Sequence, residues 1–449
     1  MGLITLSGLG SSLDIDSIVK ALVTAEGAAK TSSLNRQENT IQSSISGFGT
    51  LSSALSTFKT ALGKVNELSD FSQRVATSSD ETSVTISASS TATPANFAID
   101  VVKTAKGTQL QSGIFGASTD TVGSGNLTLT AGTNTFNISV LGTDTLTDIQ
   151  NKINTATDNF GVNVNIINSD TGTQLVFDSN ITGSANSLVI TNDNASLDSI
   201  STTLTTTQAA DDAQIKVNNL TITNSTNVFT NAVPGTTITA VKATTVGSPV
   251  DVSVSLDTDG AKTAITDFVT AYNELAKVRN DLGASSTNSV GLLNGNSTLR
   301  SLSRQLSTTA LNPVASITGS LNGLAQLGIN ITQQDGLLEI DNTKFDAAIA
   351  NNFNDVGNIF AASDGVAVSL ESIVDQYIQP LTGILVTTKS SLDEQQRAVD
   401  DGRIELSDRL AAIEVRLRKQ FGAMDALIGQ LKSTGDFLTQ QLSSLNQSN

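Results

Sequence analysis

The chain has 449 residues, a length that suggests about three domains with hydrophobic cores of their own. It contains no histidine and no cysteine, which excludes histidine-based catalytic triads, thiol nucleophiles, disulfide frameworks and the usual zinc and haem sites. The formal net charge of -17 would repel nucleic acid and anionic lipid, so neither is an expected partner.

The chain has the composition of a folded protein outside the membrane. Hydrophobic residues make up 38% of it, and no apolar run approaches the length of about 18 that a membrane span needs. Residues 1–16 carry neither a basic stretch nor a continuous apolar stretch, so no Sec signal peptide is expected. The sequence therefore predicts a cytoplasmic protein, or one exported by a route that needs no such peptide.

The N-terminal part has helical periodicity. A short amphipathic stretch over residues 15–23 is followed by a polar segment, 26–33, and then by a longer pattern. In the longer pattern apolar residues recur every seven positions, with companions that give alternating spacings of three and four, as in a coiled-coil seam. The seam positions are Leu34, Ile41, Phe48, Leu55 and Leu62.

Between residues 77 and 256 the apolar period falls to two, which predicts half-buried antiparallel strands. Asn218 and Asn219 separate two alternating runs and predict a tight hairpin, because asparagine tolerates positive φ. A helical pattern over 146–153, with Thr145 as its N-cap, interrupts the strands. The alternating runs fall at 84–86, 97–101, 127–129, 136–140, 162–166, 215–217 and 250–256.

From residue 260 the helical period returns, in a first helix that ends at Gly283. A second helix begins near Leu299, a short hairpin surrounds Asp335-Gly336, and Asn342 is the expected cap of a further helix. Near the C-terminus a second heptad seam, with one extra step of four, predicts a rod-like helix. The positions of this seam are Leu410, Leu417, Met424 and Leu431.

These patterns predict an α+β multidomain fold, in which terminal coiled-coil helices and a helical bundle leg carry an inserted antiparallel β-rich head. The two seams are expected to pack against each other within one chain, with contact between chains as the alternative. The expected parts are terminal helical segments at 1–41 and 406–449, a leg at 42–76 and 260–405, a β-rich head domain at 77–114 and 210–259, and a second inserted β-rich domain with one short helix at 115–209.

Apolar side chains at both ends of the chain stand outside the main seams, in polar surroundings. Such side chains need a cover that the free chain does not supply, so both ends are expected to become ordered on assembly. The residues predicted to bind a partner in this way are Ile15, Ile18, Leu22, Phe437 and Leu438.

Known catalytic and cofactor motifs are incomplete in this chain. The pattern from Gly8 lacks the third glycine of a dinucleotide fingerprint, and Gly63-Lys64 lacks the Ser or Thr of a P-loop. Asp257-x-Asp259-Gly260 resembles half a calcium loop, but Ala261 replaces an oxygen ligand. We therefore predict no catalytic residue, no cofactor and no metal site.

Several separate stretches resemble motifs of one family. They are Gly8–Val19 (G-L-G-S-S-L-D-I-D-S-I-V), Phe268–Asn273 (F-V-T-A-Y-N), Leu324–Asp341 (L-x-x-L-G-I with D-G-x-L and a final D), and Arg416–Asp425 (R-L-R-K-Q-F-x-A-M-D). In these stretches the chain resembles the bacterial flagellar filament-capping proteins, also called hook-associated protein 2 or FliD. Ile153-Asn154 also resembles a short motif that flagellins and hook proteins share.

The resemblance implies a non-enzymatic homo-oligomer, with a pentamer expected, at the tip of an extracellular filament. It implies that the terminal helices enter the filament end and that the β-rich insertion forms a plate under which exported flagellin folds and joins. It also implies flagellin and hook–filament junction proteins as partners, and an export chaperone before secretion without a Sec signal.

Three other functions fit parts of the same sequence. Another axial protein, such as a flagellin, also pairs terminal helices around a β insertion, although the L-G-I and Q-F-x-A-M-D motifs argue against it. A surface adhesin would bind glycans or host proteins through its Ser/Thr/Asn-rich β region, and residues 77–258 alone would then bind a glycan array. A polysaccharide-cleaving enzyme would show turnover that depends on one carboxylate.

Overall fold

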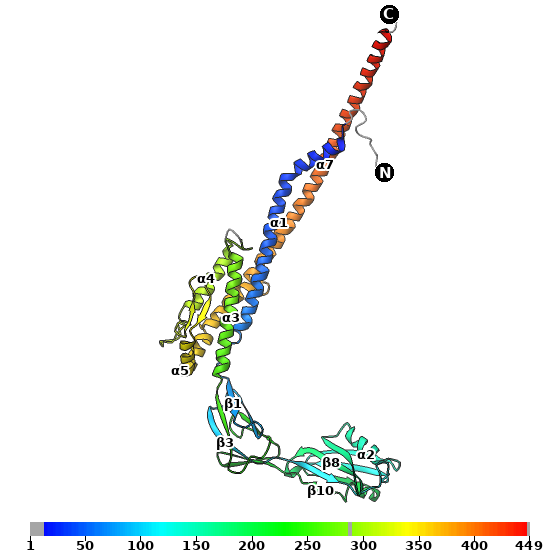
Figure 1. Cartoon of the computed structure of the whole chain (residues 1–449), viewed down its shortest axis with the longest axis vertical. Helices are drawn as coiled ribbons and strands as arrows, with labels where there is room; N and C mark the ends of the chain where they lie inside the picture. Colours follow the sequence, from blue (N-terminus) through cyan, green and yellow to red (C-terminus); the bar gives the residue numbers. More distant parts are fainter. Residues whose placement is uncertain (1–12, 286–289, 447–449) are drawn as a thin grey trace. The chain divides into compact units, whose positions relative to one another are not determined.

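The computed structural model describes residues 13–285 and 290–446 (Figure 1). It forms two compact units: a helical unit, made by the chain up to residue 68 and from residue 260, and a β-rich unit, residues 69–259. Long terminal helices pack together in the first unit, and the second contains antiparallel sheets. The predicted α+β fold class is confirmed.

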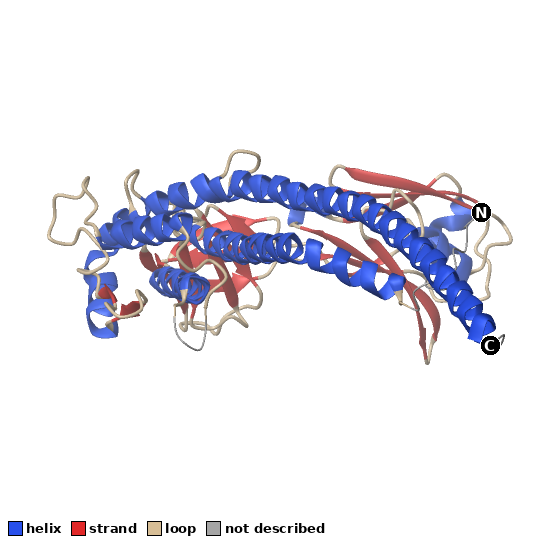
Figure 2. Cartoon of the chain, turned by 90° about the horizontal axis from the view of Figure 1, so that it is seen from above, coloured by secondary structure: helices blue, strands red, loops and turns tan. Residues whose placement is uncertain are grey.

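The helical unit is organised around two long helices. Figures 1 and 2 show α1 and α7 side by side, and Figure 1 shows α7 continuing past the start of α1. A short hairpin at the predicted position, β16 with β17, turns at Gly336, where φ is +71°. The elements of this unit are α1 (Ile15–Leu62), α3 (Thr258–Gly283), α4 (Ser297–Leu311), β16 (Ile329–Ile331), β17 (Leu338–Ile340), α5 (Asn342–Ala361), α6 (Val366–Ile378) and α7 (Ile384–Asn446).

Helix α1 is continuous, whereas the sequence pattern suggested a separate stretch before the polar segment 26–33. That segment contains alanines and no proline, and it continues the helix although Gly27, Thr31 and the serines are weaker helix formers. Gly27 lies within it at a close approach to α7, since a Cβ there would come 2.7 Å from Leu410 Cδ1. Helices α1 and α7 also pass the expected boundaries at 41/42 and 405/406 without a break.

Aromatic rings from three helices form the centre of the helical unit. The ring centroids of Phe58 (α1) and Phe268 (α3) lie 5.9 Å apart, and Phe360 (α5) stands edge-on to Phe268 at 5.5 Å. Tyr272, one turn along α3, meets Phe58 at 5.9 Å. Such pairs add to the stabilisation that burial of the rings provides. The motif F-V-T-A-Y-N therefore supplies core residues.

The β-rich unit contains four antiparallel sheets and helix α2 (Leu146–Asn154) within the described residues. The strand orders are β1-β15-β3-β11-β12, β13-β14-β2, β10-β4-β8-β7 and β6-β5-β9. The strands are β1 (Arg74–Ser78), β2 (Val84–Ala88), β3 (Ala95–Lys103), β4 (Gly107–Gln111), β5 (Gly125–Ala131), β6 (Asn134–Val140), β7 (Val162–Ser169), β8 (Gly172–Thr182), β9 (Leu188–Asn192), β10 (Thr205–Gln208), β11 (Ala213–Val217), β12 (Leu220–Asn224), β13 (Val228–Thr230), β14 (Thr236–Ala240) and β15 (Val250–Leu256).

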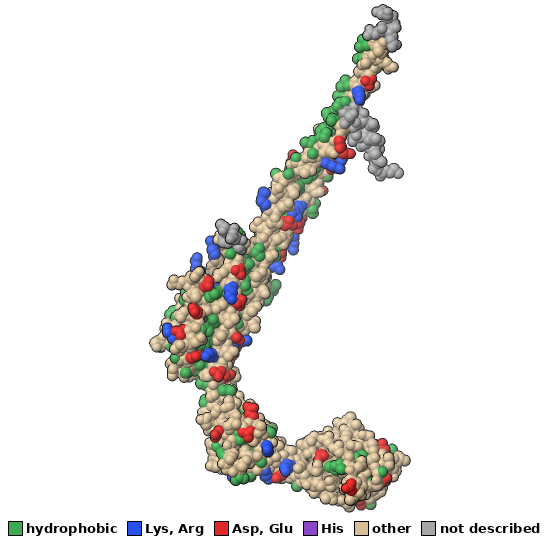
Figure 3. Space-filling model, viewed as in Figure 1, with side chains coloured by type: hydrophobic (Ala, Val, Ile, Leu, Met, Phe, Trp, Pro, Cys, Tyr) green, Lys and Arg blue, Asp and Glu red, His purple; other side chains and the backbone are tan. Residues whose placement is uncertain are grey.

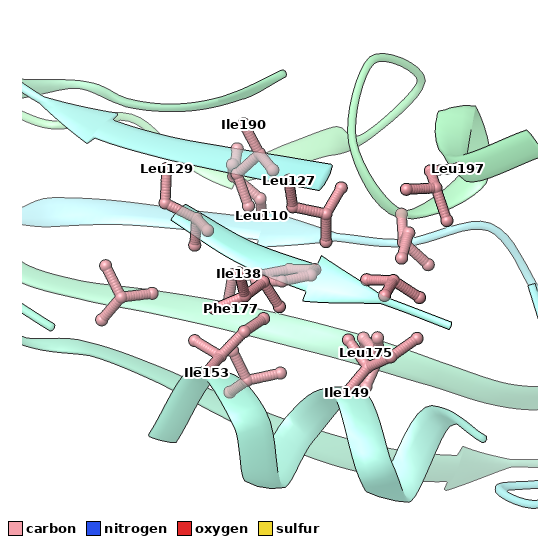
Figure 4. Packing of buried hydrophobic residues seen from close by; sticks show 14 of the residues in the cluster. Leu110, Leu127, Leu129, Ile138, Ile149, Ile153, Leu175, Phe177, Ile190 and Leu197 are labelled. Atoms are coloured by element: carbon pink, nitrogen blue, oxygen red, sulfur yellow. The ribbon is translucent and has the colours of Figure 1, made fainter. Parts of the chain in front are cut away.

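Two separate hydrophobic clusters hold the β-rich unit together. One joins β2, β3, β11, β14 and β15, with Ile99 and Ile215 among its buried residues. The other joins α2 to β4 through β9, and Figure 4 shows Ile149 and Ile153 of α2 pointing toward Leu175 and Phe177 on β8. Each cluster has its own set of strands, so the unit has two cores.

The chain enters and leaves the β-rich unit on neighbouring strands. β1 pairs antiparallel with β15, so that Arg74 lies opposite Leu256. The Asp257 amide donates to the Gln73 carbonyl at 3.0 Å, directly before the chain continues into α3. The two ends of the unit are therefore held together by its own sheet.

Three local predictions were specific enough to test. Thr145 caps α2 in a capping box with Asp148, and Asn218 and Asn219 form the tight turn at φ values of 46° and 67°, so both are confirmed. The predicted cap Asn342 is wrong, because Asp341 caps α5. Its carboxylate accepts from the next free helix amides and also carries the charge that a helix N-terminus favours.

Candidate partner-binding site

The first turn of α1 is fastened to α7. Asp14 caps α1, and hydrogen bonds from the Ser17 hydroxyl and backbone amide lower the pKa of Asp14. Asp16 forms an ion pair with Arg418 of α7, and Arg418 Nη2 also lies 2.8 Å from Glu414 Oε1. The hydrogen bond to Asp16, followed by that to Glu414, raises the pKa of Arg418. These contacts fix the point on α7 where α1 begins.

Further ion pairs set the register of the two helices. Arg409 Nη2 lies 3.4 Å from Glu26 Oε1. Arg403 donates to Glu38 through Nη1, 3.1 Å from Oε1, and through Nη2. Its Nη2 also donates to Asn35 Oδ1 at 2.8 Å. In each pair α1 supplies the acid and α7 the arginine, which favours this antiparallel pairing over pairing of like helices.

The predicted seam positions on α1 are all buried. The first two of them pack with Val399 of α7 in a small cluster, and the others face the core of the helical unit. The buried positions are Leu34, Ile41, Phe48, Leu55 and Leu62.

The predicted seam positions on α7 divide into two pairs. Leu410 and Leu417 are half-buried at the level of α1. Met424 and Leu431 lie beyond Arg418 and are 40% and 63% exposed. α1 begins at Ile15, so it has no residue opposite them, and within the described residues they are not part of a seam.

Beyond the start of α1, α7 carries an exposed apolar stripe, which we call the free face. Its members are spaced three, four, seven and four residues apart, which puts them on one side of a helix with 3.6 residues per turn. Figure 3 shows green hydrophobic side chains along this end of α7. Exposed apolar side chains gathered on one side of a helix are typical of an interaction surface. The free face consists of Met424, Leu427, Leu431, Leu438 and Leu442.

The residues predicted to bind a partner lie in different surroundings. Leu438 belongs to the free face, Phe437 is exposed beside it, and Leu22 is exposed on α1. Ile18 is half-buried. Ile15 is buried in the first turn of α1, so its side chain is already covered.

Two of the recognised motifs contact each other in the helical unit. The side-chain amide of Asn273, which closes F-V-T-A-Y-N, donates to the Leu338 carbonyl at 2.9 Å and accepts from the Leu338 amide at 2.7 Å. Leu338 belongs to the D-G-x-L hairpin. Periodicity alone missed this contact, although the short polar residue after a buried Tyr272 was a possible signal. Both motifs here serve the fold.

Asn154 has an equivalent role in the β-rich unit. Its side-chain amide donates to the Val164 carbonyl and accepts from the Val164 amide, both at 2.8 Å. Val164 lies on β7, at the edge of its sheet, so Asn154 occupies groups that another strand could bind. In the Ile153-Asn154 pair, Ile153 therefore packs in the core and Asn154 bonds to the edge strand β7.

A polar depression of about 550 Å³ lies on the sheet that contains β1, β15 and β3. Its hydroxyls bond within the sheet: Thr77 and Ser253 lie 2.8 Å apart, and Ser79 accepts from the Asp251 amide at 3.0 Å. Phe97, which also lines it, packs against the buried core. These polar groups satisfy one another, as on an ordinary sheet surface.

Across 13–285 and 290–446, no helix has the length and apolar character that crossing a membrane requires. In the same ranges, histidine, cysteine, aspartate and glutamate side chains do not gather in groups of three that could hold a metal ion.

Comparison with known proteins identifies the family. The family model described as "Flagellar hook-associated protein 2 C-terminus" matches residues 210–433, and its N-terminal counterpart matches residues 11–108. A flagellar hook-associated protein 2 of Aeromonas caviae is 31% identical over 99% of this chain and 100% of that protein. The chain belongs to the flagellar hook-associated protein 2 family.

Other members of the family support this assignment. The A-type flagellar hook-associated protein 2 of Pseudomonas aeruginosa is 30% identical over 98% of both chains. The crystal structure of the D1-D2-D3 domains of the flagellar cap protein FliD from Escherichia coli has 29% identity and a TM-score of 0.65, over 77% of this chain and 99% of that one. The family consists of structural cap proteins and not of enzymes. The resemblance drawn from the motifs is confirmed.

Proposed function

We propose that this chain caps the distal end of a bacterial flagellar filament, where it promotes the folding and polymerisation of flagellin and prevents exported flagellin from being lost. Membership of the cap-protein family supports the location at the extracellular tip. The free face of α7 is the observation that carries the proposal, because it is an apolar surface with no helix of this chain opposite it among the described residues.

The free face fits a segment that attaches to the filament end. α7 has 63 residues, about 95 Å at 1.5 Å per residue, and within the described residues its pairing with α1 ends at Arg418, the partner of Asp16. The remaining part can insert into a filament without disturbing the α1–α7 pair. Phe437 and Leu438 supply apolar contacts there, and Ile18 and Leu22 supply them from the start of α1, while Ile15 holds the first turn of α1 in place.

The proposed partners follow from this role. Flagellin and the hook–filament junction proteins are the filament subunits that the free face meets, and the subunits of the cap form a homo-oligomer, a pentamer. An export chaperone covers the apolar ends before secretion, which proceeds without a Sec signal peptide. Electron microscopy of the purified protein tests the oligomer, and rings of five subunits are the expected result.

Replacing Ile18, Leu22, Phe437 and Leu438 together by Ser tests the attachment. Leu22, Phe437 and Leu438 are exposed and Ile18 is half-buried, so the melting temperature of the isolated protein should stay nearly unchanged. Filament growth should stop, and cells that export normal amounts of the variant should release monomeric flagellin into the medium.

A matched control replaces by Ser four exposed apolar residues of the helical unit that lie outside α1 and α7. They are Leu68, Val290, Leu311 and Leu381. Cells with this variant should make filaments of normal length. Full-length filaments with the first variant would show that these residues do not attach the cap.

A further inference from the structure

The chain has very few side chains that oxidants attack. It contains no cysteine, tryptophan or histidine, and only two tyrosines and two methionines. Tyr272 and Tyr377 are both buried. Met1 lies outside the described residues, so Met424 is the single methionine whose surroundings the structure shows. Chemistry with peroxide or hypohalous acid is therefore directed at one described position.

Met424 lies where such oxidants reach it. Its side chain is 40% exposed on the free face of α7. α1 begins opposite Arg418 and runs away from Met424, so it does not cover this side chain. Leu427 and Leu431 follow it on the same side, one and two turns away, and are exposed as well. The thioether is thus open to small molecules in the free subunit and becomes covered once a partner binds the free face.

We propose that Met424 is a site of oxidative modification that weakens the grip of the free face on its partner. The sulfur takes one oxygen atom from a peroxide, which is reduced to water or an alcohol, or from a hypohalous acid, which leaves as a halide ion and a proton. The product is methionine sulfoxide. The effect on attachment rests on the proposed function, while the modification itself does not.

The modification changes binding more than folding. A sulfoxide is polar and strongly hydrated, so it opposes burial of a side chain that fills an apolar contact. In the free subunit Met424 is 40% exposed, so the added oxygen has a solvent-facing side on which to lie. The melting temperature should therefore be unchanged, while attachment should be about tenfold weaker or more.

The first test measures the chemistry on the purified full-length chain. Hydrogen peroxide should add about 16 Da to the peptide that contains Met424, at a rate within about tenfold of that for free N-acetylmethionine amide. Peptide mapping separates this product from oxidised Met1. Protection of Met424 well beyond that range would overturn the assignment.

The second test measures attachment to filament ends before and after peroxide. For the natural chain, attachment after peroxide divided by attachment before it should be about one tenth, and treatment with methionine sulfoxide reductases A and B should bring this ratio back toward one. For Met424→Leu the ratio should stay near one without that treatment. An equal ratio for both chains would overturn the effect on attachment. If the untreated chain does not attach at all, the proposed function fails, while the oxidation rate still decides the modification.

Discussion

At the scale of single residues, asparagine side-chain amides bond to strands at sheet edges in both units. Asn273 and Asn154 each bond both backbone groups of one strand residue, as described above. Asn227 makes the same pair of hydrogen bonds to a loop residue, since its side chain accepts from the Ala105 amide at 2.6 Å and donates to the Ala105 carbonyl at 3.2 Å. A side-chain amide carries both a donor and an acceptor, so one residue replaces one unit of a neighbouring strand.

Asn273→Ala should therefore destabilise the helical unit by about 2 kcal/mol, because it leaves the amide and carbonyl of Leu338 without partners. Asn280→Ala is the matched control, since Asn280 on the same helix makes a single, exposed bond to the Asp335 carbonyl. Calorimetric melting of the two variants checks the difference. Equal losses of stability would mean that the two hydrogen bonds of Asn273 contribute no more than the single one of Asn280.

Arg279 is a buried cation whose contacts are incomplete. Its side chain is 5% exposed, and burial lowers its pKa. Nη1 donates to the Ser303 carbonyl at 3.3 Å and the guanidinium lies 5.7 Å from the Tyr272 ring centroid. Among the described residues, Arg279 Nε and the Tyr272 hydroxyl have no hydrogen-bond partner.

Arg279→Met should stabilise the helical unit by about 1 kcal/mol, because it removes the cost of desolvating the charge and keeps most of the volume. Arg279→Ala should destabilise it, since it leaves a cavity. Urea unfolding of both variants gives the two signs. If both variants are less stable than the natural chain, the buried charge is net favourable.

At the scale of elements, the two glycines of α1 next to Phe48 have opposite surroundings. A Cβ on Gly47 would lie 2.7 Å from Leu293 Cγ and 3.2 Å from Leu292 Cβ, in the loop before α4. A Cβ on Gly49 would meet no atom within 4 Å. Gly47 lets the loop that carries the buried Leu293 approach the helix, whereas Gly49 faces open space.

Gly47→Ala should therefore destabilise the chain by about 1–3 kcal/mol, because Leu293 must move away, even though alanine is the better helix former. Gly49→Ala should stabilise it by about 0.5–1 kcal/mol through helix propensity alone. Thermal melting of the pair compares the same substitution two positions apart. A gain in stability for both would show that the loop yields without cost.

Most strands that sequence periodicity predicted have one buried face, although β14, which alternates in the same way, was missed. β6 alternates buried and exposed residues and was predicted, whereas β8, the longest strand described, was not. β8 has buried residues on both faces around Val176, so its pattern has no period of two. The free face followed the heptad rule as well as the seam did, so spacing alone could not say where α1 ends and the partner surface begins.

At the scale of the whole molecule, the β-rich unit is an insertion with its own cores and its own closure. The hydrophobic clusters around Ile99 and Phe177 lie entirely within residues 69–259. The pairing of β1 with β15 closes the unit without help from the helices. An insertion of this kind has what a domain needs to fold alone.

Residues 69–259 alone should give a folded protein with cooperative melting. The complementary chain, in which a linker of about four Gly and Ser residues replaces the unit, should keep its helical signal, because the linker spans the short gap that β1 and β15 span. Circular dichroism of both checks this. A fragment 69–259 that is unfolded at 25 °C would contradict it.

The closure of the β-rich unit also orders the events of folding. Phe58 and Phe268 are in contact although the whole unit lies between them in the chain, and closing so long a loop directly costs about 5 kcal/mol in chain entropy. Once the unit has folded, Gln73 and Asp257 are already joined, and 15 residues on one side and 11 on the other separate them from Phe58 and Phe268. The loop that must close to bring α1 and α3 together is then short, so its entropic cost is small. We therefore expect the β-rich unit to fold first and the core of the helical unit to form rapidly afterwards.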